Sequence, residues 1–178
     1  PPDGRLTCEM LHIATQINPP KLVAPFALEY LRRQVRLAIQ PAESSIRRVF
    51  ISRDSRESRG LANWRELAPA IESAGFTIVD PTSMTLARLI GMIMGAEVIM
   101  GVAGDAMANV FAAPARCRIG LIVARESNPQ KYAATSMTLG QEFTFLAAEV
   151  DYSSSEVLED CDLHLDSRLL ASYLSTLQ

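Results

Sequence analysis

The stretch GAEVIMGVAGDAMANV at residues 95–110 decides the fold class, because it combines a buried strand, a glycine turn and a helix start. The run AEVIM predicts the strand, and Gly101 and Gly104 predict the turn after it. Backbone N–H groups and the positive end of a helix dipole often bind phosphate in such turns. Asp105 lies near that positive end. The turn is therefore either a ligand site or a tight turn in which Asp105 only stabilises the helix.

Short apolar runs alternate with helical patterns on both sides of this stretch. Further strands are predicted at residues 48–52, 76–80, 118–123 and 143–147, and helices at residues 63–75, 83–94 and 131–139. Pro69 predicts the loss of one hydrogen bond and a kink in the first of these helices, unless that helix starts late. The alternation predicts βα units around a mostly parallel sheet. We therefore expect an α/β fold with a Rossmann-like, doubly wound sheet, which binds ligands at the carboxyl ends of its strands.

The chain divides into a central domain, expected at residues 47–150, and two flanking segments. Residues 1–46 are predicted to be irregular apart from one amphipathic helix, PFALEYLRRQVRLAI. Its apolar positions are Leu28, Leu31, Val35 and Ile39, and its arginines, Arg32, Arg33 and Arg36, are expected on a solvated face. Residues 151–178 are predicted to form a polar linker, a short edge strand in DLHLD, and a helix capped by Asp166 or Ser167.

Composition narrows the class of protein. The 178 residues carry a net charge of −3, which argues against a general nucleic-acid binder. Three separated cysteines, Cys8, Cys117 and Cys161, indicate neither a disulfide framework nor a zinc site, so a reducing cytoplasm is expected. The longest apolar region is too short for a membrane span, which needs about 20 residues. Because the sequence starts without methionine, we expect it to be a piece of a longer protein.

A second loop, SRDSRESRGLAN at residues 52–63, is rich in arginine. Arg53, Arg56 and Arg59 can each bind a pair of phosphate or carboxylate oxygens through a planar guanidinium. Asp54 and Glu57 also allow a loop of internal ion pairs without a ligand. The expected position at the carboxyl end of a strand favours an anionic ligand.

Other candidate residues have weaker support. His12 and His164 lack a companion at metal-ligand spacing and are expected to be ordinary polar residues. The acidic residues of the C-terminal segment are expected on a solvated face rather than around a cation; they are Asp151, Glu156, Glu159, Asp160 and Asp162. Trp64 is expected to pack against the sheet, although it could stack on a base or sugar.

The order of these motifs resembles glycosyltransferase family 61, which includes capsular-polysaccharide biosynthesis proteins. The resemblance rests on VFISRDSR, then Arg59 and Asn63, then AGFTIVDP, and then GAEVIMGVAGDAMANVFAAP. It covers residues 47–123 and implies the C-terminal, nucleotide-binding half of a GT-B-type transferase. Carried over by position, the residues that it assigns to the nucleotide-sugar are Ser52, Arg53, Arg59, Asn63, Gly101, Gly104 and Asn109. It assigns no catalytic residue.

Two positions depart from the family pattern. Ala103 stands where the family has histidine, and Asp105 stands where it has a small residue. Alanine can neither donate a hydrogen bond nor exchange a proton through its side chain. A carboxylate at Asp105 would repel a diphosphate at 4 Å by about 1–4 kcal/mol, depending on the local dielectric.

Three functions stay open on the sequence alone. The first is a glycosyltransferase-type domain that binds a nucleotide-sugar donor and serves capsular or extracellular polysaccharide synthesis, with a glycan acceptor and an N-terminal partner domain. The resemblance implies no metal for the donor, and we expect no cofactor. The second is a catalytically inactive relative with a structural or regulatory role. The third is a domain that binds another phosphorylated small molecule.

Overall fold

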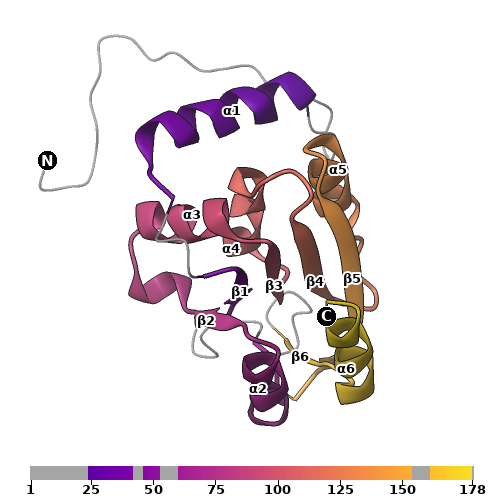
Figure 1. Ribbon diagram of the computed structural model, residues 1–178. Helices are drawn as coiled ribbons and strands as arrows, with labels where there is room; N and C mark the ends of the chain where they lie inside the picture. Colours follow the sequence, from indigo (N-terminus) through magenta and orange to yellow (C-terminus); the bar gives the residue numbers. More distant parts are fainter. Residues whose placement is uncertain (1–23, 42–45, 53–59, 154–160, 178) are drawn as a thin grey trace, which may run out of the picture.

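A computed structural model describes residues 24–41, 46–52, 60–153 and 161–177 (Figure 1). The helices are α1 (Pro25–Ala38), α2 (Trp64–Ser73), α3 (Leu86–Gly95), α4 (Asp105–Ala108), α5 (Gln130–Thr138) and α6 (Ser167–Ser175), with 3-10 turns η1 (Pro81–Ser83) and η2 (Asn109–Ala112). The strands are β1 (Arg48–Ile51), β2 (Thr77–Val79), β3 (Val98–Val102), β4 (Arg118–Ala124), β5 (Glu142–Asp151) and β6 (Asp162–His164).

The described strands form a mixed, mostly parallel sheet in the order β2-β1-β3-β4-β5-β6. Strands β1 to β5 pair in parallel, and β6 pairs antiparallel with β5. The chain steps from β1 to β2 and then crosses to the other side of β1 to form β3, so the strand order reverses between β1 and β3. The sheet is curled, so that β6 comes next to the segment before α2, where a bridge joins Leu163 to Leu61. The α/β prediction is confirmed.

Two apolar layers hold the helices against the sheet. Successive strand residues point to opposite faces, so strands covered on both sides consist of nearly continuous apolar runs. Val49 and Ile51 of β1 pack in the layer that includes α3, whereas Phe50 packs in the layer that includes α2 and α6. Figure 1 shows α1 and α3 on one side of the sheet and α2 and α6 on the other.

The structure corrects the boundaries of the opening stretch. Strand β3 extends to Val102, so Gly101 lies inside the strand rather than in the turn. Its neighbours in the sheet are Ile51 of β1 and Leu121 of β4. The helix that follows is a four-residue α4 that continues as the 3-10 turn η2.

Helix α1 also differs from its prediction. Its inward stripe is Leu28, Arg32, Val35 and Ile39, whereas Leu31 is 49% exposed. The Arg32 guanidinium donates to the carbonyls of Ala113 and Leu139, which are the C-cap residues of η2 and α5. Such carbonyls lack helical partners and attract a cation. The expectation of a solvated face was therefore wrong for Arg32, while Arg33 and Arg36 are exposed.

Other local predictions can be compared directly. Helix α2 continues through Pro69, which is exposed, at the loss of one intrahelical hydrogen bond. The predicted edge strand is β6, and Asp166 caps α6 by accepting from the backbone N–H groups of Arg168 and Leu169. No helix within the described ranges is long and apolar enough to cross a membrane. The domain boundaries at residues 46 and 150 stay predictions.

Two weak acids, the buried Cys117 and the partly buried Tyr173, make the fold sensitive to alkali. Burial raises the pKa of Cys117 from 9.0 to about 12 and that of Tyr173 from 10.0 to about 12. Above pH 9 the unfolded chain ionises first, so it binds fewer protons than the folded chain and the free energy of unfolding falls. This fall is expected mainly between pH 9 and 12, by up to about 1.4 kcal/mol per pH unit for each group. Urea melts at stepped pH measure it. In Tyr173→Phe the decline should be shallower above pH 10, and an unchanged slope would contradict this assignment.

Candidate functional site

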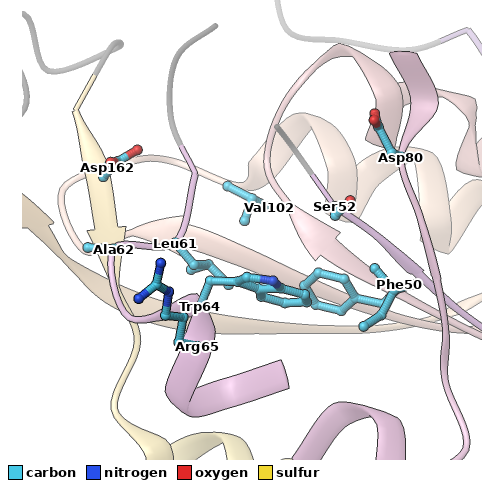
Figure 2. A pocket seen from close by; sticks show the side chains of 10 residues that line it. Phe50, Ser52, Leu61, Ala62, Trp64, Arg65, Asp80, Val102 and Asp162 are labelled. Atoms are coloured by element: carbon cyan, nitrogen blue, oxygen red, sulfur yellow. The ribbon is translucent and has the colours of Figure 1, made fainter. Parts of the chain in front are cut away.

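A pocket of about 500 Å³ opens where β1, β2 and β3 end. Its volume lies within the range of about 300–1,000 Å³ that is typical of small-molecule sites. The lining residues are Phe50, Ser52, Leu61, Ala62, Trp64, Arg65, Ile78, Asp80, Val102 and Asp162 (Figure 2). They come from the ends of three adjacent strands, the first turn of α2 with the residues before it, and β6.

The position of the pocket follows from the strand order. Phe50 of β1, Ile78 of β2 and Val102 of β3 all face the α2 side of the sheet. They lie near the carboxyl ends of these strands, where the connecting loops begin. The strand order reverses between β1 and β3. In open α/β sheets, ligands bind in the crevice at such a reversal because the flanking loops diverge there. The pocket thus occupies the place that the predicted fold assigns to a ligand.

Two aromatic rings form the apolar floor of the pocket. The rings of Phe50 and Trp64 stack with centroids 5.2 Å apart and planes inclined by 30°. Figure 2 shows the two rings beside each other, with Ser52, Val102 and Asp162 above them in the view. Phe50 is fully buried, whereas Trp64 is partly exposed. The expected packing of Trp64 against the sheet is confirmed, and its ring also lines the pocket.

Polar groups surround this floor. Asp80 ends the β2 segment, and its Oδ1 accepts hydrogen bonds from the N–H of Thr82 at 2.8 Å and the hydroxyl of Thr82 at 2.7 Å. On the β6 side, Oδ1 of Asp162 accepts from the N–H of Gly60 at 2.7 Å. Arg65 adds a cation from the first turn of α2. The rim therefore combines two oriented carboxylates with one guanidinium.

The arginine-rich loop joins two parts of this rim. Ser52 and Leu61 both line the pocket, and the loop connects them in the sequence. The N–H and hydroxyl of Ser52 donate to the carbonyl of Val79 at 2.8 and 3.1 Å. Arg53 and Arg59, which the family resemblance assigns to the nucleotide-sugar, lie outside the described residues. Their role stays a prediction.

Asn63 connects the start of α2 to a distant part of the chain, and its proposed contact with the nucleotide-sugar stays a prediction. It occupies the N-cap position of α2, but its side chain makes no cap hydrogen bond. Its Nδ2 donates to the carbonyl of Leu165 at 2.9 Å, and its Oδ1 accepts from the N–H of Leu165 at 3.2 Å. This pair ties the start of α2 to the segment between β6 and α6. Its Nδ2 also donates to Oε2 of Glu66, one turn into α2, at 3.3 Å.

This cross-link gives a stability prediction. Asn63→Ala removes both hydrogen bonds to Leu165, a buried residue whose backbone groups lose their partners. We expect the free energy of unfolding to fall by about 2–3 kcal/mol, because each hydrogen bond contributes about 1 kcal/mol and the orphaned groups add a desolvation cost. Chemical denaturation measures the change. Asn128→Ala, in an exposed turn, is the matched control; equal losses in both variants would contradict the cross-link.

The remaining glycine-turn candidates do not line the pocket. A Cβ on Gly101 would lie 2.7 Å from the carbonyl oxygen of Ile51 and 2.9 Å from Sδ of Met107, so the strands require glycine there for packing. Gly104 is the N-cap of α4, and its carbonyl accepts from the Tyr132 hydroxyl at 3.2 Å. Asn109 donates to the carbonyl of Ala106 at 3.1 Å. Their assignment to a ligand stays a prediction.

Two further candidates lie elsewhere. His164 lines a second cavity of about 500 Å³ beside Arg125 and Glu149, which form an exposed ion pair at 2.5 Å. Such exposed pairs contribute little to stability. Of the predicted acidic cluster, Glu156, Glu159 and Asp160 lie outside the described residues. Within the described part, no group of three His, Cys, Asp or Glu side chains gathers as a metal site would need.

Sequence reasoning missed several pocket residues. Asp80 was seen only as the last residue of a strand, and Phe50 and Arg65 were not singled out. One signal could have identified Asp80. It lies at the carboxyl end of the strand that follows the arginine-rich loop in the sequence. Asp162 lies 102 residues from Gly60, so no local pattern links them.

The comparison with protein families adds to this geometry. The Glycosyltransferase 61 family model matches residues 3–120, more than half of the chain. This chain belongs to glycosyltransferase family 61. The match includes β1, β2, β3 and both loops that the sequence singled out, so the pocket lies mainly within the family region of this glycosyltransferase-type domain. Asp162 lies beyond the match. Among curated proteins, none matches the chain.

Proposed function

We propose that this glycosyltransferase-type domain binds a nucleotide-sugar donor at the carboxyl edge of its sheet and belongs to a pathway of capsular or extracellular polysaccharide synthesis. In this proposal it is the Rossmann-like half of a GT-B architecture, and an N-terminal partner domain contributes to recognition of the glycan acceptor. The cytoplasmic setting expected from the cysteines is part of the same proposal.

One observation carries the proposal of donor binding. The pocket at the reversal of strand order is lined by the two residues, Ser52 and Leu61, that flank the arginine-rich loop. Ser52 lies at the end of β1, and Arg53 is the residue that follows it in the sequence. The apolar floor offers a surface for a flat or ring-shaped group. A nucleotide-sugar has this combination of a dianionic diphosphate and ring-shaped ends.

The chemistry would be mainly electrostatic. Glycosyl transfer leaves negative charge on the departing diphosphate, and guanidinium groups placed at that charge lower the barrier without proton exchange. Arg53 and Arg59 are the residues proposed for this role. Arg65, in the first turn of α2, adds a cation that lines the pocket. The acceptor base stays unassigned.

Isothermal titration calorimetry tests donor binding directly. Folded protein is titrated with UDP, GDP, ADP and CDP at up to millimolar concentration, and at least one is expected to bind with measurable heat. Far-UV circular dichroism verifies the fold before each titration. If none of the four nucleotides gives binding heat with folded protein, the proposed donor binding is overturned.

A specific observation favours one alternative, a relative that has lost its donor site. In the turn after β3, Asp105 begins α4 and adds a negative charge at the helix end that the family resemblance assigns to the ligand. Ala103 replaces the family histidine. The alternative predicts that nucleotide binding appears only in Ala103→His combined with Asp105→Ala. Binding by the unmodified chain at comparable affinity would contradict it.

A further inference from the structure

We infer that the β2 side of the pocket recognises the ribose of the donor, with the Asp80 carboxylate accepting hydrogen bonds from the ribose hydroxyls. The inference rests on the proposed donor binding and specifies its orientation. The nucleoside would lie over the ends of β1 and β2, and the diphosphate would lie toward Ser52.

The place of Asp80 in the topology supports this orientation. Strand β2 follows β1 through α2 and pairs with β1 in parallel, so Asp80 and Ser52 lie at the ends of neighbouring strands. Both line the same pocket. In parallel sheets that bind dinucleotides, an acidic residue about 20 residues after the first loop bonds the ribose, because the sugar is carried from the first strand toward the second.

The hydrogen bonds of Asp80 prepare it for such a contact. Thr82 donates to Oδ1 from both its N–H and its hydroxyl, which fixes the orientation of the carboxylate. In the described part of the chain, no hydrogen bond reaches Oδ2 of Asp80. An ionised carboxylate only accepts hydrogen bonds, and vicinal ribose hydroxyls supply two donors. Asp80 is half-buried, so water competes less strongly than at an open surface.

The other carboxylate of the pocket has a different role. Oδ1 of Asp162 accepts from the N–H of Gly60, and Asp162 lies on the opposite, β6 wall. Asp162 therefore holds the end of the arginine loop in position. Between the two walls, Ile78 and the partly exposed ring of Trp64 offer apolar contact for a base beside the ribose.

The charge of Asp80 makes it possible to distinguish a contact with the ribose from a contact with the phosphates. Asp80→Asn removes a negative charge near a negative ligand, so electrostatics alone would tighten binding of any phosphate. The variant keeps the side-chain oxygen that Thr82 contacts and nearly the same volume. Weaker nucleotide binding in Asp80→Asn with unchanged pyrophosphate binding therefore indicates a lost favourable contact, such as the one to ribose.

The experiment compares three classes of probe by calorimetry on the wild type and Asp80→Asn: the nucleoside diphosphate that binds best, its 2′-deoxy counterpart, and inorganic pyrophosphate. The wild type is expected to bind the 2′-deoxy form about tenfold more weakly, which corresponds to one hydrogen bond to a charged group. Asp80→Asn is expected to weaken the ribonucleotide by about tenfold and to bring the two forms close to equal affinity. Pyrophosphate binding is expected to be unchanged or tighter.

Two variants complete the design. Thr82→Val keeps the charge of Asp80 but removes the hydroxyl that orients it, so the preference for ribose should fall while pyrophosphate binding stays constant. This variant also tests the inference if Asp80→Asn fails to fold. Glu97→Gln removes an exposed carboxylate near the amino ends of β1 and β3, where it pairs with Arg47, and should change none of the affinities.

The outcomes distinguish the inference from the proposed function. Equal wild-type affinity for the ribo and deoxy forms, or an unchanged preference in Asp80→Asn, would overturn the ribose contact while leaving donor binding intact. A parallel loss of nucleotide and pyrophosphate binding in Asp80→Asn would also overturn it, because the site as a whole would then be disturbed. No binding of any nucleotide by the wild type would overturn the proposed function itself.

Discussion

Replacing Arg53 and Arg59 together by alanine is expected to weaken binding of the best nucleoside diphosphate by at least about a hundredfold. A hydrogen bond to a charged group contributes about 1.5–3 kcal/mol, so two guanidinium contacts with the diphosphate account for a loss of this size. Calorimetry measures the affinity. The salt dependence of the remaining affinity should be shallower, since two cation–phosphate interactions are gone.

The control for this variant must remove the same charge elsewhere. Arg47→Ala with Arg118→Ala lowers the net charge by the same two units at the opposite edge of the sheet. There Arg47 pairs with Glu97 and Arg118 lies 3.5 Å from Glu142. The control should keep nucleotide affinity within a few fold, because exposed charges more than about 10 Å away are screened. Equal weakening in the two double variants would attribute the loss to net charge and contradict a site at the arginine loop.

Gly101→Ala is expected to lower the free energy of unfolding by about 3 kcal/mol, the upper end of the usual range for overpacking. The new Cβ would lie 2.7 Å from the carbonyl oxygen of Ile51, a backbone atom that moves only if β1 and β3 separate. The Sδ of Met107 at 2.9 Å closes the other side. For a chain of this length the loss corresponds to a melting temperature lower by about 6–12 °C, which scanning calorimetry measures.

Gly104→Ala separates packing from the glycine pattern of the turn. Gly104 has extended backbone dihedral angles of 171° and −177°, which alanine can adopt, and it is only partly buried. We expect a loss within about 1 kcal/mol, since glycine and alanine differ modestly at an N-cap. Comparable destabilisation by both substitutions would show that the turn, rather than the contact with Ile51, requires glycine.

The sequence predicted the elements of the fold well, because their signals are local. Apolar runs gave β1 to β5 to within a few residues, and Asp166 signalled the start of α6. The error in α1 has a physical cause. Leu31 and Arg32 are adjacent, and helical spacing admits either on the inward face. The open carbonyls of Ala113 and Leu139, distant in sequence, selected Arg32.

The candidate site was only partly predictable. Ser52 lines the pocket, Asn63 binds the backbone of Leu165, and Gly101 packs inside β3, while the assignment of all three to a nucleotide-sugar stays a prediction. Sequence position predicted a site at the carboxyl edge of the sheet, and a pocket lies at that edge. It could not give the partner of each polar side chain, because one amide or carboxylate can bond a ligand, a cap or a remote backbone group with similar energy.

By itself, the sequence determined the α/β class and the family, since the strand pattern and the ordered motifs both lie in the linear chain. Only the tertiary structure decided which side chains share a pocket. It joined Phe50 to Trp64 and Gly60 to Asp162, and it placed Asp80 in the same pocket. The reason is that curling of the sheet brings β6 to the segment before α2, a contact across about 100 residues that no local propensity encodes.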